Sequence, residues 1–309
     1  MNSNDCIMRV DILKEAGFQE AMLGISTNKK KYDRDMYNIS LQLSKAGPGH
    51  DKFLEMIHLW IDYTCCRSIH QQIDTYRVGV TKSSESTHHM LIEDVLNTCI
   101  NYKMIEQFFN SKGYILNAEK LPGRELPINA TALLISKLNN QKLTESDLQL
   151  YMEKYLVISD PTIERIDANK IMLSLMEVLK QSFKIDYEKY YSMFEGGSES
   201  ITKDTVDIMV DLAMSMDEDR QGKLHRLKRM LPEGFLQRRI MCLNYKALRN
   251  MINQRFMDPF MHWKMFIQQI ISQCEHPEYF ADILEKYHTN IDEIKNHMCN
   301  GKPYDYISE

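Results

Sequence analysis

Hydrophobic positions in the N-terminal part of the chain switch repeatedly between a strand-like and a helix-like period. Met8–Leu13 alternates apolar and polar residues and predicts a strand, and Phe18–Ile25 then predicts a helix. Tyr32–Leu43 carries apolar residues at helical spacing up to the Gly-Pro-Gly break at residues 47–49. Phe53–Tyr63 is rich in aromatic and β-branched residues, which indicates a second strand.

From about Ile92 onward, helical spacing dominates. Helices are predicted over Leu143–Leu156, Ile171–Phe183, Lys203–Met216, Phe235–Arg255 and Trp263–Cys274. Strands near the start and helices over most of the rest indicate an α+β fold. We expect one domain over residues 1–299, with a helical elaboration at about 103–219, and a C-terminal tail at 300–309.

Composition narrows the classes of function. With 309 residues, of which 43% are hydrophobic, the chain can bury a sizeable core. Its net charge of −5 argues against duplex DNA binding but is compatible with a small anionic ligand held by local arginines. No apolar run approaches the length of a membrane span, and the first residues lack the pattern of a signal peptide.

The seven cysteines indicate reduced thiols. Their number is odd, their spacing is irregular, and the adjacent pair Cys65-Cys66 forms no CxxC motif. We therefore expect a cytoplasmic protein without disulfides. No cysteine and histidine set has the spacing of zinc ligands, so no metal site is predicted.

The segment from Gln72 to His89 concentrates polar chemistry. It contains Arg77, Lys82 and a run of hydroxyl side chains around the Glu85 carboxylate. Charged N–H and short O–H donors at this density suit the oxygens of a phosphate-bearing ligand. The alternative is a polar surface loop without a ligand, because loops are exposed and polar by default.

A second polar set lies far along the chain. Lys228 precedes Leu231-Pro232, and Asn244, Asn250 and Arg255 follow. On one helix the two asparagines would lie about 240° apart, so they suit a broad ligand between helices or a subunit interface. They are equally compatible with ordinary polar positions on a half-exposed helix.

Taken in order, these residues resemble the flavin-dependent thymidylate synthase family. That family has an early serine after a helix, a histidine before a strand, a Gln-x-x-Arg-His-Arg signature, a Ser/Asn/Glu/Ser run, an Arg-x-x-Leu-Pro element, and two asparagines with an arginine. The matching residues here are Ser26, His50, Gln72, Arg77, Thr81, Ser84, Glu85, Ser86, Lys228, Leu231, Pro232, Asn244, Asn250, Arg255 and Trp263.

The chain departs from the family pattern at several positions. Thr75-Tyr76 stands where the signature has Arg-His, and Lys228 stands where an arginine is expected. His88 or His89 occupies another arginine position. Tyrosine does not titrate near neutral pH, so any imidazole role is lost at Tyr76. The pattern is similar to a distant branch associated with bacteriophages.

The resemblance implies a fold and an activity. The fold would be a small, mostly antiparallel central sheet flanked by long helices, with an enlarged helical segment. The activity would be modification of C5 in a pyrimidine deoxynucleotide, by default reductive methylation of dUMP to dTMP. FAD would be the cofactor, methylenetetrahydrofolate the carbon donor, and NADPH a candidate reductant. The assembly would be a homotetramer.

The resemblance also implies residue roles. Arg255 would stabilise negative charge on the pyrimidine as the ring is attacked, and would also bind it. Gln72, Arg77, Ser86 and Lys228 would bind the nucleotide, chiefly its phosphate. Flavin contacts would come from Ser26, His50, Tyr76, Ser84, Glu85, Asn244 and Asn250.

Two other functions stay open at this point. One is hydroxymethylation or another modification of dUMP or dCMP for modified-base DNA, motivated by the altered signature. The other is a nucleotide-binding or assembly protein that kept the fold and lost catalysis.

Overall fold

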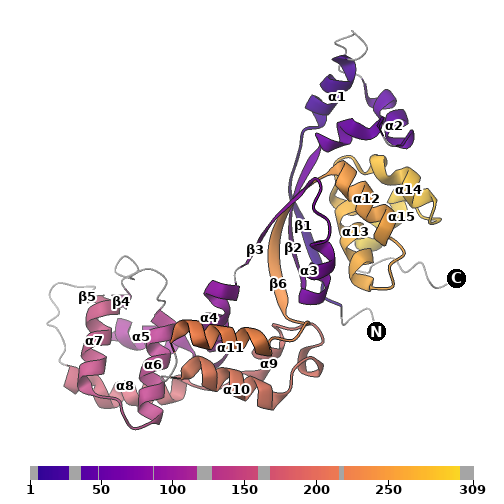
Figure 1. Cartoon of the computed structure of the whole chain (residues 1–309). Coiled ribbons are helices and arrows are strands. Elements are labelled where there is room, and N and C mark those ends of the chain that lie inside the picture. Colours follow the sequence, from indigo (N-terminus) through magenta and orange to yellow (C-terminus); the bar gives the residue numbers. More distant parts are fainter. Residues whose placement is uncertain are drawn as a thin grey trace. The chain divides into compact units, whose positions relative to one another are not determined.

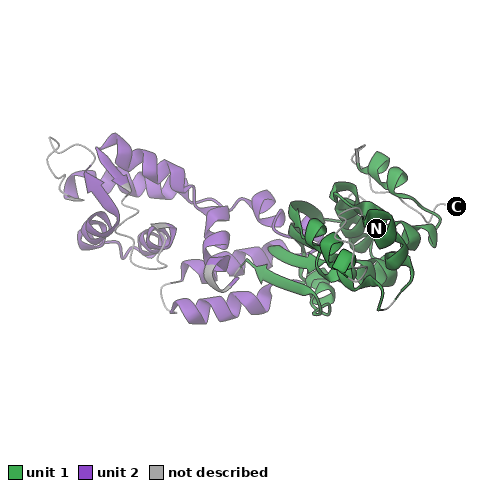
Figure 2. Ribbon diagram, turned by 90° about the horizontal axis from the view of Figure 1, so that it is seen from above, with its two compact units in different colours: residues 1–85, 233–309 green, residues 86–232 purple. Residues whose placement is uncertain are grey.

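The computed structural model describes residues 6–27, 36–47, 49–85, 87–116, 127–158, 168–215 and 219–299. The chain forms two compact units. Unit 1 contains residues 1–85 and 233–309, and unit 2 contains residues 86–232 (Figure 2). Unit 2 is therefore inserted, in sequence, between two parts of unit 1.

Unit 1 is a mixed sheet and helix structure. Its elements are β1 (Arg9–Ala16), α1 (Phe18–Thr27), α2 (Tyr37–Lys45), η1 (Asp51–Glu55), β2 (His58–Cys66), α3 (Arg67–Ile73), β3 (Val80–Ser84), β6 (Leu236–Asn244), α12 (Tyr245–Arg255), α13 (Met261–Gln273), η4 (Pro277–Phe280), α14 (Ala281–Glu285) and α15 (Ile291–Cys299).

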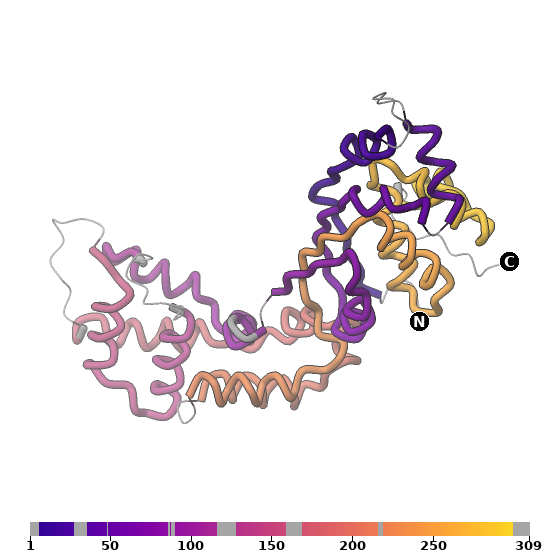
Figure 3. The backbone as a smooth tube through the Cα atoms, turned by 45° about the horizontal axis from the view of Figure 1, so that its top comes forward, coloured from indigo at the N-terminus to yellow at the C-terminus, as the bar shows by residue number. Residues whose placement is uncertain are grey.

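The four strands of unit 1 form one antiparallel sheet in the order β1-β2-β6-β3 (Figure 1). Strand β6 lies between β2 and β3, so a strand from late in the chain joins two early ones. Tyr63 of β2 lies opposite Arg239 of β6, and Val80 of β3 lies opposite Leu243. Residues 58–66 and 80–84 are thus neighbours of residues 236–244 in space, as the tube in Figure 3 shows.

One face of this sheet holds the core. Along β2, Leu59, Ile61 and Tyr63 are buried and alternate with half-buried residues. The buried side chains belong to the same apolar cluster as residues of α12 and α13. The Tyr63 ring meets Phe266 of α13 edge-on, with ring centroids 6.0 Å apart. The period-2 pattern therefore directs these side chains toward the helices.

The predicted helix Phe235–Arg255 is wrong in its first half. Leu236–Asn244 is strand β6, and only Tyr245–Arg255 is helical. Leu236, Ile240 and Leu243 satisfy helical spacing, which explains the prediction. The stretch nevertheless forms the inner strand, because β2 and β3 supply hydrogen-bonding partners on both of its edges.

Other predicted elements fare better. A strand, β1, and a helix, α1, occur where they were expected. The predicted strand Phe53–Tyr63 begins only at His58, because Phe53 and Leu54 lie in the short helix η1. The predicted helix Tyr32–Leu43 is described from Tyr37 onward, and its earlier part lies outside the described residues.

Unit 2 is mainly helical. It contains α4 (Thr87–Cys99), α5 (Tyr102–Ser111), β4 (Tyr114–Leu116), α6 (Pro127–Asn139), α7 (Glu145–Tyr155), β5 (Leu156–Ile158), α8 (Ala168–Ser182), α9 (Tyr187–Tyr191), η3 (Gly197–Glu199), α10 (Lys203–Met214) and α11 (Arg220–Met230). Helix α7, which lies in the predicted range Leu143–Leu156, begins with a side-chain cap: the Thr144 side chain accepts a hydrogen bond from Asp147 N.

The expected helical elaboration at about 103–219 lies inside unit 2, whose limits extend beyond it on both sides. The assignment of residues 1–299 to a single domain stays a prediction, and the tail 300–309 lies outside the described residues. Within the described part of the chain, no helix has both the length and the apolar character needed to cross a bilayer.

Candidate ligand-binding site

The start of helix α12 is joined to the turn that precedes β3. Asn244 caps the helix, because its Oδ1 accepts from Ala247 N at 2.8 Å. Its backbone N–H donates to Gly79 O at 3.0 Å. Gly79 has a φ of +69°, and a Cβ added there would lie 2.5 Å from Asn244 Nδ2. The turn from Tyr76 to Gly79 is therefore held against α12, and glycine is required at its end.

Further along α12, side chains from both distant segments form a connected group around the indole ring of Trp263. We call this group the Trp263 cluster. It consists of Gln72, Tyr76, Asn250, Gln254, Arg255, Asp258 and Trp263. All of these residues belong to unit 1.

Trp263 is the fully buried base of the cluster. Its indole Nε1–H donates to Gln72 Oε1 at 2.8 Å, which joins α13 to the end of α3. The Tyr76 ring meets the indole edge-on, with centroids 5.8 Å apart. The Arg255 guanidinium carbon lies 5.2 Å from the indole centroid. This places a cation over an aromatic face, a favourable arrangement.

Arg255 is held from two further sides. Its Nη1 donates to Asp258 Oδ2 at 2.7 Å, and its Nε donates to the Tyr76 hydroxyl at 3.1 Å. The hydrogen bond to Asp258, followed by the one to Tyr76, raises the pKa of Arg255 above its ordinary value. The side chain is 29% exposed, so a fixed positive charge is presented at the surface of unit 1.

The Tyr76 hydroxyl extends this network along α12. It donates to Gln254 Oε1 at 3.0 Å, and Gln254 Nε2 donates to Asn250 Oδ1 at 3.1 Å. Gln72, Tyr76, Asn250 and Arg255 are thus connected in space. Sequence reasoning had placed two of them in each of two segments that lie far apart along the chain.

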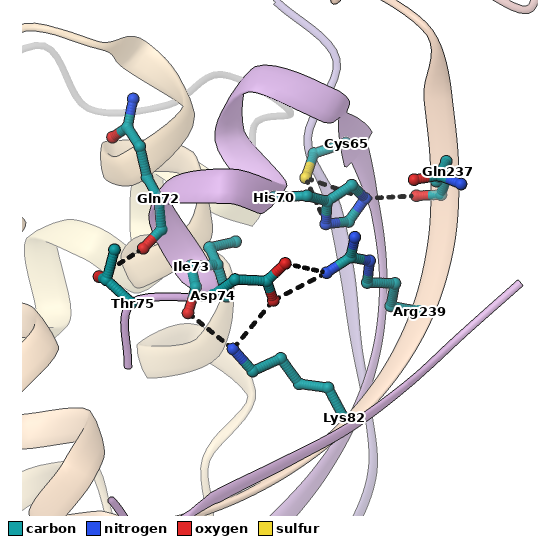
Figure 4. A network of polar contacts seen from close by, with 9 residues as sticks. All are labelled: Cys65, His70, Gln72, Ile73, Asp74, Thr75, Lys82, Gln237 and Arg239. Atoms are coloured by element: carbon teal, nitrogen blue, oxygen red, sulfur yellow. Dashed lines mark hydrogen bonds and ion pairs between the residues drawn. The ribbon is translucent and has the colours of Figure 1, made fainter. Parts of the chain in front are cut away.

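A second polar network is centred on Asp74, the residue that directly follows α3 (Figure 4). Asp74 accepts from Arg239 Nη1 at 2.9 and 3.0 Å and from Lys82 Nζ at 3.1 Å. Lys82 also donates to Ile73 O at 2.7 Å. Burial raises the pKa of Asp74, but the hydrogen bonds from Arg239 and Lys82 outweigh it and lower the pKa overall.

His70 in the same network is a buried structural residue. Its Nε2 lies 3.0 Å from Gln237 O, and Cys65 Sγ lies 3.5 Å from its Nδ1. Burial is the main cause that lowers the pKa of His70 to about 4, with a further contribution from Arg239. The imidazole is therefore neutral at pH 7. Together these contacts fix the backbone on which Gln72 and Tyr76 are carried.

Arg77, Ser84 and Glu85 are exposed. Within the described part of the chain, Arg77 forms no ion pair or side-chain hydrogen bond. Ser84 lies opposite Arg239 in the sheet, and Glu85 N donates to Arg238 O at 3.0 Å. Ser86 lies outside the described residues.

Ser26 and His50 are not linked to the Trp263 cluster by any described contact. Ser26 is completely buried in α1, and its Oγ donates to Leu23 O at 2.7 Å. His50 is exposed at the start of η1. Lys228 lies half-buried in α11 of unit 2. The proposed roles of these residues stay predictions.

Sequence reasoning missed several residues of the two networks. Gln254 follows Asn250 by four residues and Asp258 follows Arg255 by three, so helical spacing offered a local signal for both. Asp74, Lys82 and Arg239 offered no such signal, because their pairing depends on the arrangement of α3, β3 and β6.

Two other places in the described part of the chain have features of a ligand site. Glu15, Glu275 and His276 lie close enough to share a cation. Glu15 already accepts from Tyr245 OH at 2.5 Å and from Glu275 N at 2.9 Å, and we assign no metal there. A cavity of about 440 Å³ lies inside unit 2, between α4, α6, α10 and α11, and contains none of the predicted site residues.

The fold and cluster define an α+β protein with a four-stranded antiparallel sheet and a tryptophan-based polar site. No family model and no curated protein matches the sequence. The chain is similar to two solved structures of flavin-dependent thymidylate synthase ThyX from Helicobacter pylori, both with FAD and dUMP. Identity is 15% and 14%, and each TM-score is 0.47. The alignments cover 90% and 89% of this chain, and 100% and 99% of the others.

Proposed function

We propose that this protein is a flavin-dependent enzyme that modifies C5 of a pyrimidine deoxynucleotide. The default reaction is reductive methylation of dUMP to dTMP, with methylenetetrahydrofolate as carbon donor. NADPH is the proposed reductant of the flavin. We assign this reaction to the chain because its sequence motifs follow the order found in flavin-dependent thymidylate synthases.

One observation carries the proposal. Gln72 and Tyr76, from the segment after α3, share the Trp263 indole with Arg255 of α12. The sequence motifs required these two distant segments to meet. A separation of the segments within unit 1 would have removed the basis for one ligand contacting both of them.

The donor groups of the cluster fit the proposed ligands. A flavin ring and a pyrimidine ring both present carbonyl oxygens, and a nucleotide adds a phosphate. Guanidinium and carboxamide groups are suitable donors to all of these. When bound, the flavin would supply hydride chemistry, whereas the protein residues bind and orient.

Individual residues then take specific roles in the proposal. Arg255 binds the pyrimidine and stabilises negative charge on its oxygen, because its positive charge is fixed by Asp258 and Tyr76. Gln72 and the exposed Arg77 bind nucleotide oxygens. Asn250, in the middle of α12, contacts the flavin.

The remaining assignments fit less directly. Asn244 uses its side-chain oxygen to cap α12. The buried Ser26 hydroxyl donates to its own helix. A flavin contact from Asn244 would need the second lone pair of its side-chain oxygen or its amide nitrogen. A flavin contact from Ser26 would need a lone pair of its hydroxyl oxygen. The roles expected of Tyr76, His50, Ser84, Glu85, Ser86 and Lys228 are kept as proposals for each residue by itself.

Flavin binding and product analysis test the proposal. Purified protein titrated with FAD is expected to retain the cofactor through gel filtration, with the visible absorbance of oxidised flavin. Incubation with dUMP, methylenetetrahydrofolate and NADPH is expected to yield dTMP by mass spectrometry. Arg255→Ala is expected to lose turnover, whereas Arg249→Lys keeps a charge opposite Asp282 and serves as a control outside the cluster. Protein that neither takes up FAD nor converts dUMP would refute the proposal.

Tyr76 favours one alternative, in which the reaction adds a hydroxymethyl or another group to dUMP or dCMP. The family histidine is replaced here by a hydroxyl that is engaged with Arg255 and Gln254. Product mass distinguishes the cases: a methyl product from dUMP alone would exclude the alternative. A homotetramer, a phage origin and a cytoplasmic location belong to the same proposal, and light scattering tests the first.

A further inference from the structure

Two groups of the Trp263 cluster can only donate hydrogen bonds: Trp263 Nε1–H and Arg255 Nε–H. They fix the direction of the other hydrogen bonds in the cluster. An indole N–H can only donate, so the atom of Gln72 that lies 2.8 Å from Trp263 Nε1 is the carboxamide oxygen. The Gln72 amide nitrogen is therefore turned to the other side. Within the described part of the chain, no group accepts a hydrogen bond from it.

The same reasoning applies from Arg255. Its Nε–H can only donate, so the Tyr76 hydroxyl accepts at 3.1 Å and uses its own proton toward Gln254 Oε1 at 3.0 Å. Gln254 Nε2 then donates to Asn250 Oδ1 at 3.1 Å. The Asn250 amide nitrogen is left at the end of the chain of hydrogen bonds, with no acceptor among the described residues.

Each acceptor oxygen of the cluster already accepts one hydrogen bond. Both Asp258 oxygens accept, one from Arg255 Nη1 at 2.7 Å and one from Phe260 N at 3.0 Å. The carboxamide oxygens of Gln72, Gln254 and Asn250 each accept a hydrogen bond as well. The groups of the cluster that have no hydrogen-bonding partner among the described residues are donors: Gln72 Nε2, Asn250 Nδ2 and Arg255 Nη2.

We infer that these three donors of the Trp263 cluster bind an oxyanion, and that Tyr76 is the positioning residue that fixes their orientation. The inference rests on the proposed function and names the ligand chemistry of that site. Donors around a positive guanidinium favour an oxygen that carries or develops negative charge. Two parts of a nucleotide supply such an oxygen, the phosphate and a ring carbonyl.

Tyr76 is essential to this arrangement because its hydroxyl connects Arg255 to Gln254 and, through Gln254, to Asn250. Without its hydroxyl, Gln254 loses the proton donor that fixes the orientation of its carboxamide. Either orientation is then allowed, and Asn250 can present its oxygen instead of its nitrogen. The Arg255 Nε also loses its acceptor, so the guanidinium is held only by Asp258 and by the indole face.

Trp263 fluorescence provides the readout. The chain has two tryptophans, Trp60 and Trp263, and Trp60 lies in β2 outside the cluster. In a Trp60→Phe background, Trp263 is therefore the only tryptophan emitter. This protein is titrated separately with inorganic phosphate, deoxyuridine and dUMP. Phosphate alone tests the phosphate source, deoxyuridine tests the carbonyl source, and dUMP carries both.

Tyr76→Phe is compared with Tyr287→Phe as the matched control. The Tyr287 hydroxyl donates to Asn253 O at 3.0 Å, so this control also loses a hydroxyl hydrogen bond in unit 1. Tyr76→Phe is expected to weaken binding of the responding ligand about tenfold, because donors are misdirected, whereas Tyr287→Phe changes it less than about twofold. Gln254→Leu interrupts the network at an exposed position and is expected to give a smaller loss in the same direction.

Every outcome decides the inference. A fluorescence response to phosphate or deoxyuridine that depends on Tyr76 supports it and identifies the oxygen involved, and a Tyr76-dependent response to dUMP alone supports it with both oxygens required. No response to any of the three ligands overturns it, as does equal binding by Tyr76→Phe and Tyr287→Phe. FAD retention is measured on the same samples. A protein that retains FAD without Tyr76 dependence refutes only this inference, whereas Tyr76-dependent binding without FAD refutes only the proposed function.

Discussion

Replacing Gly79 with alanine tests the contact that places the Tyr76–Gly79 turn on helix α12. Gly79 has a φ of +69°, and the added Cβ would lie 2.5 Å from the Asn244 amide nitrogen. That carboxamide is the N-cap of α12 and cannot stay in place with a Cβ so close. The substitution therefore strains the backbone and displaces the cap together.

The expected cost follows from these two effects. Alanine in the left-handed region costs about 1 kcal/mol relative to glycine. Loss of a helix N-cap costs about 1 kcal/mol as well. Gly79→Ala is therefore expected to lower the free energy of unfolding by about 2 kcal/mol, and Asn244→Ala by about 1 kcal/mol. In the double variant the cap is already absent, so the total is about 2 kcal/mol rather than about 3 kcal/mol.

Urea unfolding followed by tryptophan fluorescence measures these values. Both tryptophans lie in unit 1, so the signal reports that unit. Gly24→Ala is the control: it lies inside helix α1, and its Cβ would meet only Met56 Sδ at 3.5 Å. It is expected to stabilise the protein slightly, because alanine has the higher helix propensity. Additive costs in the Gly79/Asn244 double variant would refute the proposed contact between cap and turn.

Three further outcomes are expected. The pKa of His70 is about 4 when folded against 6.5 in the unfolded chain, so the unfolded state binds more protons between these values and stability falls as pH drops through that window. His70→Gln should flatten this pH dependence in urea titrations, and an unchanged slope would contradict it. Trp263→Phe removes the donor to Gln72 and should weaken dUMP binding by about threefold to tenfold in calorimetry; unaltered affinity would argue against that anchor. Arg255→Lys keeps the charge but loses the Nε contact to Tyr76, so turnover should fall by at least about tenfold, and near-normal turnover would exclude the positioning role.

Local pattern was sufficient for elements that depend on their own residues. The alternation in Met8–Leu13 and the helical spacing in Leu143–Leu156 identified strand β1 and helix α7, because strand and helix periods are local properties. The polar composition of the segment after Gln72 likewise identified a candidate site. Its partner residues Asn250 and Arg255 were identified through their order and spacing.

The strand β6 and the contacts of the site could not be read in the same way. Leu236–Asn244 fits a helical period, and it becomes a strand because two other strands flank it. The pairing of Asp74 with Arg239 follows from that sheet, and the same sheet brings the turn at Gly79 to Asn244. These contacts join residues more than a hundred positions apart, so no local rule contains them.

The sequence by itself determined which side chains are available: an arginine, carboxamides, a tyrosine in place of a histidine, and a tryptophan. Only the tertiary structure decided that Gln72, Tyr76 and Arg255 meet at one indole ring, and that the hydrogen bonds from Arg255 through Tyr76 and Gln254 to Asn250 run in one direction. The physical reason is that a donor-only group orients its partner only when the two meet in space, and this meeting depends on strand β6 joining both halves of unit 1.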